Sequence, residues 1–163
     1  MSLYTPQQLL AIYVRDLLGQ PEGSVVVLGR HNVDRNDLTS LRIAVDTDGP
    51  ATRRNASRSY DGDAEQVQHA QQWSQPCVLN FYGDDAYGEA KRFMLITNGQ
   101  RGYELQRDNG VAVFLASTVT DVKLLTGEDF SNRFELAVNV QYTESATEDV
   151  LRIDTAQFTI IED

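Results

Sequence analysis

The sequence predicts an α+β domain in which a mixed, mainly antiparallel sheet is flanked by two or three helices and carries a projecting polar β-hairpin. Arg133 to Tyr142 (RFELAVNVQY) alternates apolar and polar residues without a break, which is typical of a strand with one buried and one exposed face. Helical patterns gather at the start and in the middle of the chain instead of alternating with strands. The segment Pro50 to Pro76 is polar and centred on Asp61-Gly62, a strong hairpin signal.

The first element is predicted to be a helix. Thr5 is a good N-cap, Pro6 suits the first turn, Gln8 stands where a capping-box partner belongs, and Gly19 ends the helix. Two strands are expected next, and they should pair with each other across a polar loop. These segments are the strands Ser24 to Gly29 and Leu41 to Val45 and the loop Arg30 to Ser40.

The polar hairpin is the least usual part of the sequence. Two strands, Thr52 to Tyr60 and Glu65 to Ser74, are predicted to project as an arm of about residues 52–74. Composition alone leaves a disordered loop open as an alternative, because the segment is poor in aliphatic residues. Val67 and Trp73 favour an ordered hairpin that has a partner.

The second half should contain one strand, two helices and three further strands. A strand from Cys77 to Tyr82 leads into a helix that Asp84 and Asp85 would cap, and Asn98-Gly99 would end it. A short helix, three strands, a polar loop and a short acidic turn after Tyr142 complete the chain. The helix is Arg101 to Asp108, the strands are Val111 to Val119, Arg133 to Tyr142 and Val150 to Ile161, and the loop is Thr120 to Asn132.

The strand Arg133 to Tyr142 fixes which side chains should face the helices. Leu136 and Val138 are predicted to be buried, whereas Glu135 and Asn139 should face water, a channel or a neighbour. If Glu135 faces only water, Glu135→Ala should change stability by less than about 0.5 kcal/mol.

Composition restricts the classes of function. With 163 residues the chain is expected to form one domain, 1–163, that buries a sizeable core. Its 24 acidic residues against 14 Lys plus Arg give a net charge of -10, which argues against wrapping nucleic acid. The start, MSLYTPQQ, has no signal-peptide pattern, and the longest apolar run is too short to span a bilayer. We therefore expect a soluble protein made inside a cell.

No motif in the sequence demands an enzyme or a cofactor. Asp61, Asp63 and Glu65 mimic the start of a calcium loop, but the required Gly and the bidentate Glu are missing, so turn residues are the better interpretation. His31 and His69 lack the spacing of zinc ligands. Cys77, which begins an apolar strand, is interpreted as a small buried side chain rather than a catalytic thiol. We expect no catalytic, cofactor-binding or metal-binding residues.

The segment Val119 to Glu135 (VTDVKLLTGEDFSNRFE) carries a resemblance to a known family. A strand, Asp-x-x-x-Leu-Leu, an acidic-aromatic pair, an Arg and an alternating strand resemble the neck or tail terminator proteins of tailed bacteriophages. The order of elements is similar over most of the chain, including the N-terminal helix, the strands split by an Arg-rich loop, the polar hairpin and the strand that ends in Tyr-Gly-Asp before a helix.

The resemblance implies a structural virion protein of the tail or neck, made in the host bacterial cytoplasm. Such proteins form a ring, usually of six copies, that caps the tail tube and joins it to the head connector while DNA passes through the channel. Its implied partners are further copies of itself, a tail tube or sheath protein and the head-tail connector protein, and no membrane. The expected subunit or partner contacts are Arg53, Arg54, Arg58, Trp73, Lys123, Leu124, Leu125, Phe130 and Glu135.

Two other classes of function stay open at the level of sequence. One is an enzyme or small-ligand-binding domain with an unfamiliar site. The other is an adaptor that assembles with other proteins by pairing of edge strands.

Overall fold

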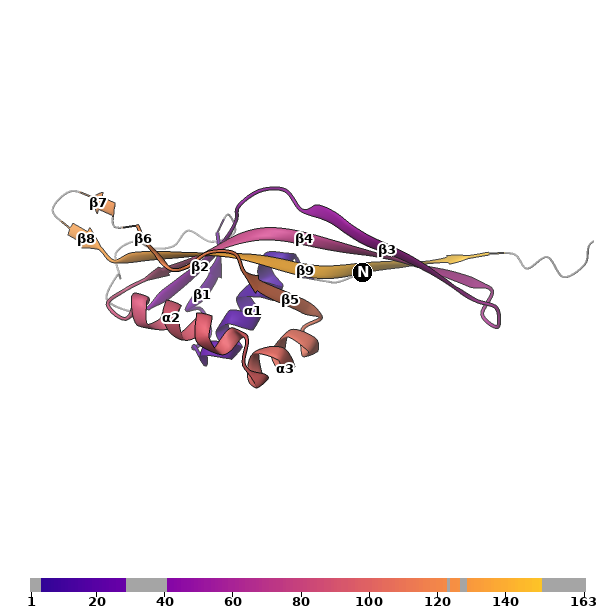
Figure 1. The fold of residues 1–163 in the computed structure, drawn as a ribbon, viewed down its shortest axis with the longest axis horizontal. Helices are drawn as coiled ribbons and strands as arrows, with labels where there is room; N and C mark the ends of the chain where they lie inside the picture. The colour runs from indigo at the N-terminus through magenta and orange to yellow at the C-terminus, as the bar shows by residue number, and fades with distance from the viewer. Residues whose placement is uncertain (1–3, 29–40, 123, 127–128, 151–163) are drawn as a thin grey trace, which may run out of the picture.

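The computed structural model describes residues 4–28, 41–122, 124–126 and 129–150. These residues form an elongated molecule with helices gathered on one side of a long sheet, which extends beyond them as an arm (Figure 1). The predicted α+β class is therefore confirmed. The elements are α1 (Pro6–Leu18), β1 (Val25–Val27), β2 (Arg42–Thr47), β3 (Thr52–Asp61), β4 (Gln66–Tyr82), α2 (Ala86–Thr97), α3 (Gln100–Asp108), β5 (Val111–Leu115), β6 (Thr120–Asp121), β7 (Leu124–Thr126), β8 (Asp129–Ser131) and β9 (Arg133–Asp149).

The main sheet is built around β4 and β9. Its strand order is β1-β2-β4-β9-β5, with β3 beside the first half of β4 and β6 beside the start of β9. The predicted pairing of the first two strands is confirmed, and β1 runs parallel to β2 whereas every other pair is antiparallel. The predicted loop at 30–40 and nearly all of the predicted strand at 150–161 lie outside the described residues.

The helix α1 begins with the predicted capping box. The Thr5 side chain accepts a hydrogen bond from the Gln8 backbone N–H, and the Gln8 side chain accepts one from the Thr5 N–H in return. Gly19 ends the helix in the left-handed conformation with φ 66°, which glycine adopts without steric cost.

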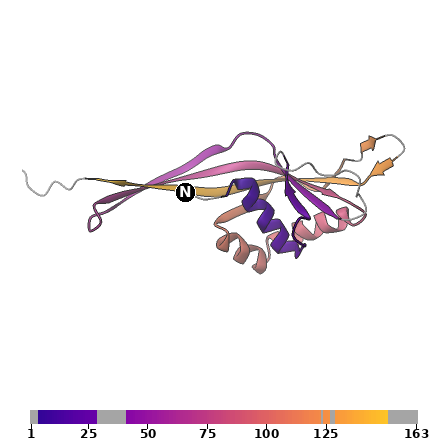
Figure 2. The same ribbon diagram turned by 180° about the vertical axis from the view of Figure 1, so that it is seen from behind.

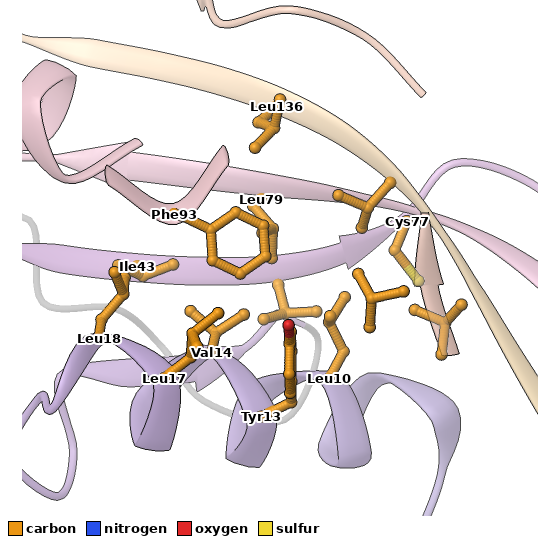
Figure 3. Close-up of a cluster of buried hydrophobic side chains, with 14 of the residues drawn as sticks. Leu10, Tyr13, Val14, Leu17, Leu18, Ile43, Cys77, Leu79, Phe93 and Leu136 are labelled. Atoms are coloured by element: carbon orange, nitrogen blue, oxygen red, sulfur yellow. The ribbon is translucent and has the colours of Figure 1, made fainter. Parts of the chain in front are cut away.

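One face of α1 packs on the sheet and forms the core (Figure 3). From the helix come Leu10, Tyr13, Val14 and Leu17, all buried, because they recur at helical spacing. The sheet contributes the side chains that alternate onto the same face of β2, β4 and β9. They are Ile43, Val45, Cys77, Leu79, Phe81, Leu136, Val138 and Val140. The predicted burial of Leu136 and Val138 is confirmed, with 0% and 1% of their surface exposed.

The helices α2 and α3 complete this layer, with one correction. Asp85 occupies the N-cap position of α2, but its side chain makes no capping hydrogen bond, so the predicted cap is wrong for this residue. It contributes negative charge near the helix N-terminus instead. At the junction of α2 and α3, a Cβ on Gly102 would lie 2.2 Å from the carbonyl oxygen of Thr97, so only glycine fits there.

The strand β4 is longer than predicted because Pro76 does not interrupt it. The Pro76 carbonyl accepts from the Asp48 N–H at 3.0 Å, so the edge of Pro76 that would carry an N–H faces the turn between β2 and β3. Since no strand pairs there, the missing donor costs no hydrogen bond of the sheet. The predicted strands Glu65 to Ser74 and Cys77 to Tyr82 are therefore one strand.

The strand β9 is also longer than predicted, and its neighbours are shorter. The segment from Thr143 to Asp149, predicted as an acidic turn, continues β9 and pairs with β4 as far as Gln66. The predicted strand Val111 to Val119 ends at Leu115 as β5. The predicted polar loop Thr120 to Asn132 contains β6 and the small hairpin β7–β8.

Candidate functional site: a three-stranded arm

The part of the sheet that extends past the helices is called the arm here. It consists of Thr52–Asp61 in β3, residues 66–74 of β4 and residues 141–149 of β9, with β4 in the centre. Figure 2 shows it from behind, projecting away from the helix-covered body. The predicted hairpin with a partner is confirmed, the disordered alternative is wrong, and the partner is β9 of the same chain.

The tip of the arm is a turn held by a carboxylate. Asp61 Oδ1 accepts hydrogen bonds from the N–H groups of Asp63 and Ala64, at 3.0 and 3.2 Å. Glu65 follows with φ 52°, and its carbonyl accepts from the Val150 N–H at 2.8 Å. The acidic residues here thus shape the turn. Among the described residues, no three His, Cys, Asp or Glu side chains are grouped so that they could hold a metal ion.

One face of the arm carries both arginine and glutamate side chains, and each kind lies along its own edge. Side chains on one face of β4 include Val67, His69 and Gln71, because alternate residues share a face. Their cross-strand partners are Tyr60, Arg58 and Ala56 on β3, and Glu148, Ala146 and Glu144 on β9. Arginine therefore lies along the β3 edge and glutamate along the β9 edge. The His69 Nε2 lies 3.1 Å from a Glu148 carboxylate oxygen.

The opposite face of the arm is small and polar. Its rows run from β3 across β4 to β9 as Ser57–Ala70–Ser145, Ser59–Gln68–Thr147 and Asp61–Gln66–Asp149. The difference between the two faces shows that alternation, not solvent exposure alone, governs the sequence of the arm.

A β-bulge near the base of β3 is held by a glutamine. The register shifts between Arg53 and Ala56, and the Gln71 side-chain amide donates to the carbonyl of Asn55 at 3.0 Å. Arg53 Nε donates to the Oε1 of the same Gln71 side chain. Bulges twist an edge strand and interrupt its pairing pattern, so this one sets the orientation of Arg54 and of the strand beyond it.

The arm meets the body at Trp73. Trp73 lies between Arg53 on β3 and Tyr142 on β9, and its indole Nε1 is buried without a hydrogen-bond partner among the described residues. Burial, with smaller contributions from Glu144 and Cys77, raises the pKa of Tyr142. Aromatic side chains thus occupy the position where the apolar core gives way to the polar arm.

The structure places the predicted contact residues in two groups at opposite ends of the sheet (Figure 1). Arg53, Arg54, Arg58 and Trp73 lie on the arm. Backbone pairing joins Leu124 in β7 to Ser131 and Leu125 to Phe130 in β8, at the far end from the arm tip. Lys123 lies outside the described residues.

Glu135 belongs to neither group. It is half-buried in the body, and its carboxylate accepts a hydrogen bond from the Arg133 guanidinium. Arg133 Nη2 also donates to the buried Asn80 Oδ1 at 2.9 Å. The basic group that Glu135 meets is therefore in its own strand.

Sequence reasoning missed the acidic side of the arm. His69, Glu144 and Glu148 were not among the predicted contact residues, since Thr143 to Asp149 was interpreted as a turn. The signal was present, because the two β-branched residues Thr143 and Thr147 alternate in step with the acidic residues and extend the pattern of Arg133 to Tyr142.

Two further features concern the reactivity of Cys77 and the length of the helices. Burial, together with the charges of Asp46 and Asp48, raises the pKa of the Cys77 thiol to about 12, so this side chain does not supply a thiolate nucleophile at neutral pH. No helix in the described part of the chain is both long and apolar enough to cross a bilayer.

The side chains of β3 and of the end of β9 are exposed, and no residue of the arm except Tyr142 packs against the core cluster. In a comparison with known families, the one described as phage neck terminator protein matches residues 10–163. The chain belongs to this family, which places it among the structural proteins of the phage tail and neck that contact other virion proteins. A search of curated proteins found no match.

Proposed function

We propose that this protein forms a ring, of six copies, at the head-proximal end of the phage tail tube, where it ends the tail and joins it to the head connector. Family membership supports the neck location. The observation that carries assembly is the arm. All ten residues of β3 and the residues of β9 from Thr143 to Asp149 are exposed, so this surface does not serve the core of its own chain.

Charge supports a role for the channel of the ring as a passage for DNA. A net charge of -10 repels the phosphate backbone and favours passage without binding. The partners in this proposal are further copies of the chain, the tail tube or sheath protein and the connector protein. The chain acts as one domain, 1–163, with the arm as its main contact surface and the β7–β8 hairpin as a second one.

Electron microscopy of assembled tails tests this proposal. Tails made in cells that supply a tagged form of the chain should show a ring of label at the head-proximal end. Native mass spectrometry of the isolated neck should give several copies of the chain for each complex. One copy per complex, or label along the tube or at its far end, would contradict the proposal.

A further inference from the structure

The arm leaves two strand edges exposed, and they differ in chemistry. In the described residues, no strand pairs with the outer edge of β3, nor with the outer edge of β9 beyond Tyr142, where β9 pairs only with β4. Unpaired N–H and C=O groups along such edges are ready to pair with another chain. Arg53 and Arg58 lie on the β3 edge, whereas Glu144 and Glu148 lie on the β9 edge, and all four belong to one face.

Within one chain these charges are held apart. Arg58 and Ala146 both pair with His69, so β4 separates the arginine from the acidic edge by two strand spacings, roughly 10 Å. The structure shows no ion pair that joins Arg58 to Glu144 or Glu148; the carboxylate of Glu148 meets His69 instead. A second β3 laid beside β9 would bring its arginines within one strand spacing, about 5 Å, of both glutamates.

Strand direction decides what kind of assembly this contact can make. Both β3 and β9 run antiparallel to β4, so they run parallel to each other. Rotation about a ring axis preserves the direction of strands that run along this axis, and with the arms so oriented β9 of one copy would meet β3 of the next as a parallel pair. A two-fold dimer would place β3 beside β3 or β9 beside β9, with arginine against arginine or glutamate against glutamate, which is unfavourable.

We propose that the copies in the ring are joined head to tail through the arm, with the arginine-bearing β3 edge of one copy beside the glutamate-bearing β9 edge of the next. This inference rests on the ring proposed above and adds which surfaces meet and in which sense. Closing the ring pairs every open edge of every arm, so the arms of the assembled ring leave no strand edge for further association.

Disulfide trapping in assembled tails tests the contact. Ser59→Cys is combined with Ser145→Cys, Thr147→Cys or Asp149→Cys, three positions on the same face of β9 that cover a small shift of register. Ser59 and Thr147 flank Gln68 and lie roughly 10 Å apart within a chain, which is beyond the reach of a disulfide. The buried Cys77 takes no part. At least one pair should give, after oxidation, a ladder of linked chains on a non-reducing gel.

The matched control is Gln68→Cys with Thr147→Cys. These two residues are direct cross-strand partners in one chain, so they should link within the chain and give no ladder. Neck complexes that hold several copies but give no ladder with any of the three pairs overturn the head-to-tail contact alone. Complexes with one copy overturn the ring proposal itself, so the two failures are distinguishable.

Charge reversal provides an independent measurement. Arg58→Glu, or the pair Glu144→Arg and Glu148→Arg, places like charges at the contact and should lower the yield of assembled necks at least about tenfold. Combining all three substitutions restores opposite charges and should recover most of the yield. Equal yields for the wild type and both reversed forms, or no recovery in the combined form, would contradict the proposal. Circular dichroism of each variant checks that the fold is retained.

Discussion

Gln106 shows how one polar side chain can connect four elements of the body. Its amide nitrogen donates to the Tyr13 hydroxyl of α1 at 3.3 Å and to the Thr97 carbonyl of α2 at 3.2 Å, and its oxygen accepts from the Val113 N–H of β5 at 2.9 Å. The residue itself is in α3 and is only 8% exposed. Because the surroundings are buried, each of these groups would lack water if the amide were removed.

Replacing this amide should therefore destabilise the protein. Gln106→Ala leaves the buried Val113 N–H without its partner and the Tyr13 hydroxyl with only Thr97 Oγ1, and we expect it to lower the free energy of unfolding by about 1–3 kcal/mol. Arg107→Ala is the control, since the neighbouring Arg107 is exposed and pairs with Asp108 on the surface. Urea denaturation measures both. Similar midpoints for the two variants would contradict a structural role for the amide.

The raised pKa of the Cys77 thiol predicts how the stability of the fold changes at alkaline pH. Its pKa is raised from 9.0 to about 12 by burial and by Asp46 and Asp48, so the folded protein keeps the thiol proton where the unfolded chain loses it. Stability should therefore fall as pH rises from about 9 to about 12, by up to about 1.4 kcal/mol per pH unit from this group.

A comparison with Cys77→Ala isolates this contribution. The substitution leaves a small cavity, which lowers stability at every pH. It also removes the contribution of the thiol to the fall of stability with pH. Denaturant melts at pH 8, 9, 10 and 11 should therefore give a steeper decline for the wild type. Parallel declines in the two proteins would show that the thiol titrates alike in the folded and unfolded states.

Leu136 and Glu135 test the two faces of β9. Leu136→Ala removes a fully buried side chain and should cost about 2–5 kcal/mol, a large share of a typical stability of about 5–15 kcal/mol. Glu135→Ala removes a half-buried ion pair with Arg133 and should cost about 1 kcal/mol or less. Denaturant melts of the two variants measure both costs, and the larger loss should belong to Leu136.

At the scale of elements, the arm should be separable from the body. Thr52 and Ser74 are cross-strand partners, so a short Gly-Ser link in place of Arg53 to Trp73 can close the chain without strain. Of the apolar side chains removed, Val67 is buried but lies outside the core cluster. We expect the helix-covered body to keep its fold, by circular dichroism and a cooperative melt, while assembly into tails fails.

The end of β9 requires a second, matched deletion. Removing Arg53 to Trp73 leaves Thr143 to Asp149 without β4, and this exposed stretch invites non-specific pairing. A variant that also ends the chain after Tyr142 separates that effect from the loss of the contact surface. Infectious particles made with either variant would remove the arm from the set of assembly contacts.

The sequence predicted the elements well where one face of a strand or helix is buried. Strict alternation placed Leu136 and Val138 in the core, and the capping box placed the start of α1. It misjudged the ends of strands where apolar residues no longer alternate with polar ones. Pro76 and the run Glu144 to Asp149 both look like interruptions, yet the proline faces a turn and the acidic residues line an exposed edge.

The sequence indicated only the arginine side of the proposed contact surface. Arg53, Arg54 and Arg58 stand out because cations are rare in this acidic chain, whereas Glu144 and Glu148 are hidden among 24 acidic residues. Only the pairing of β9 with β4 shows that they flank the same strand. Gln106 was missed because a glutamine in a short, largely polar helix gives no sign that its amide is buried.

At the scale of the whole molecule, association should depend on concentration and on a partner. The chain carries a net charge of -10, so copies repel one another except where the arm offers arginine. We expect a monomer in dilute solution that assembles into a ring on its tail or connector partner. Sedimentation velocity at micromolar concentration measures the first state, and a stable hexamer in the absence of any partner would contradict the expectation.

The unbroken pairing of β4 with β9 also determines how the molecule responds to force. The two strands are joined from Gln66 and Asp149 at the arm tip to Tyr82 and Arg133 beneath the helices. A pull along the arm is parallel to the strands, so the backbones of both β4 and β9 carry it into the body, and the hydrogen bonds between them are not opened one after another. The arm should thus behave as a rigid element and not as a flexible linker. Tension or tilt applied at its tip passes directly into the strands that carry the core.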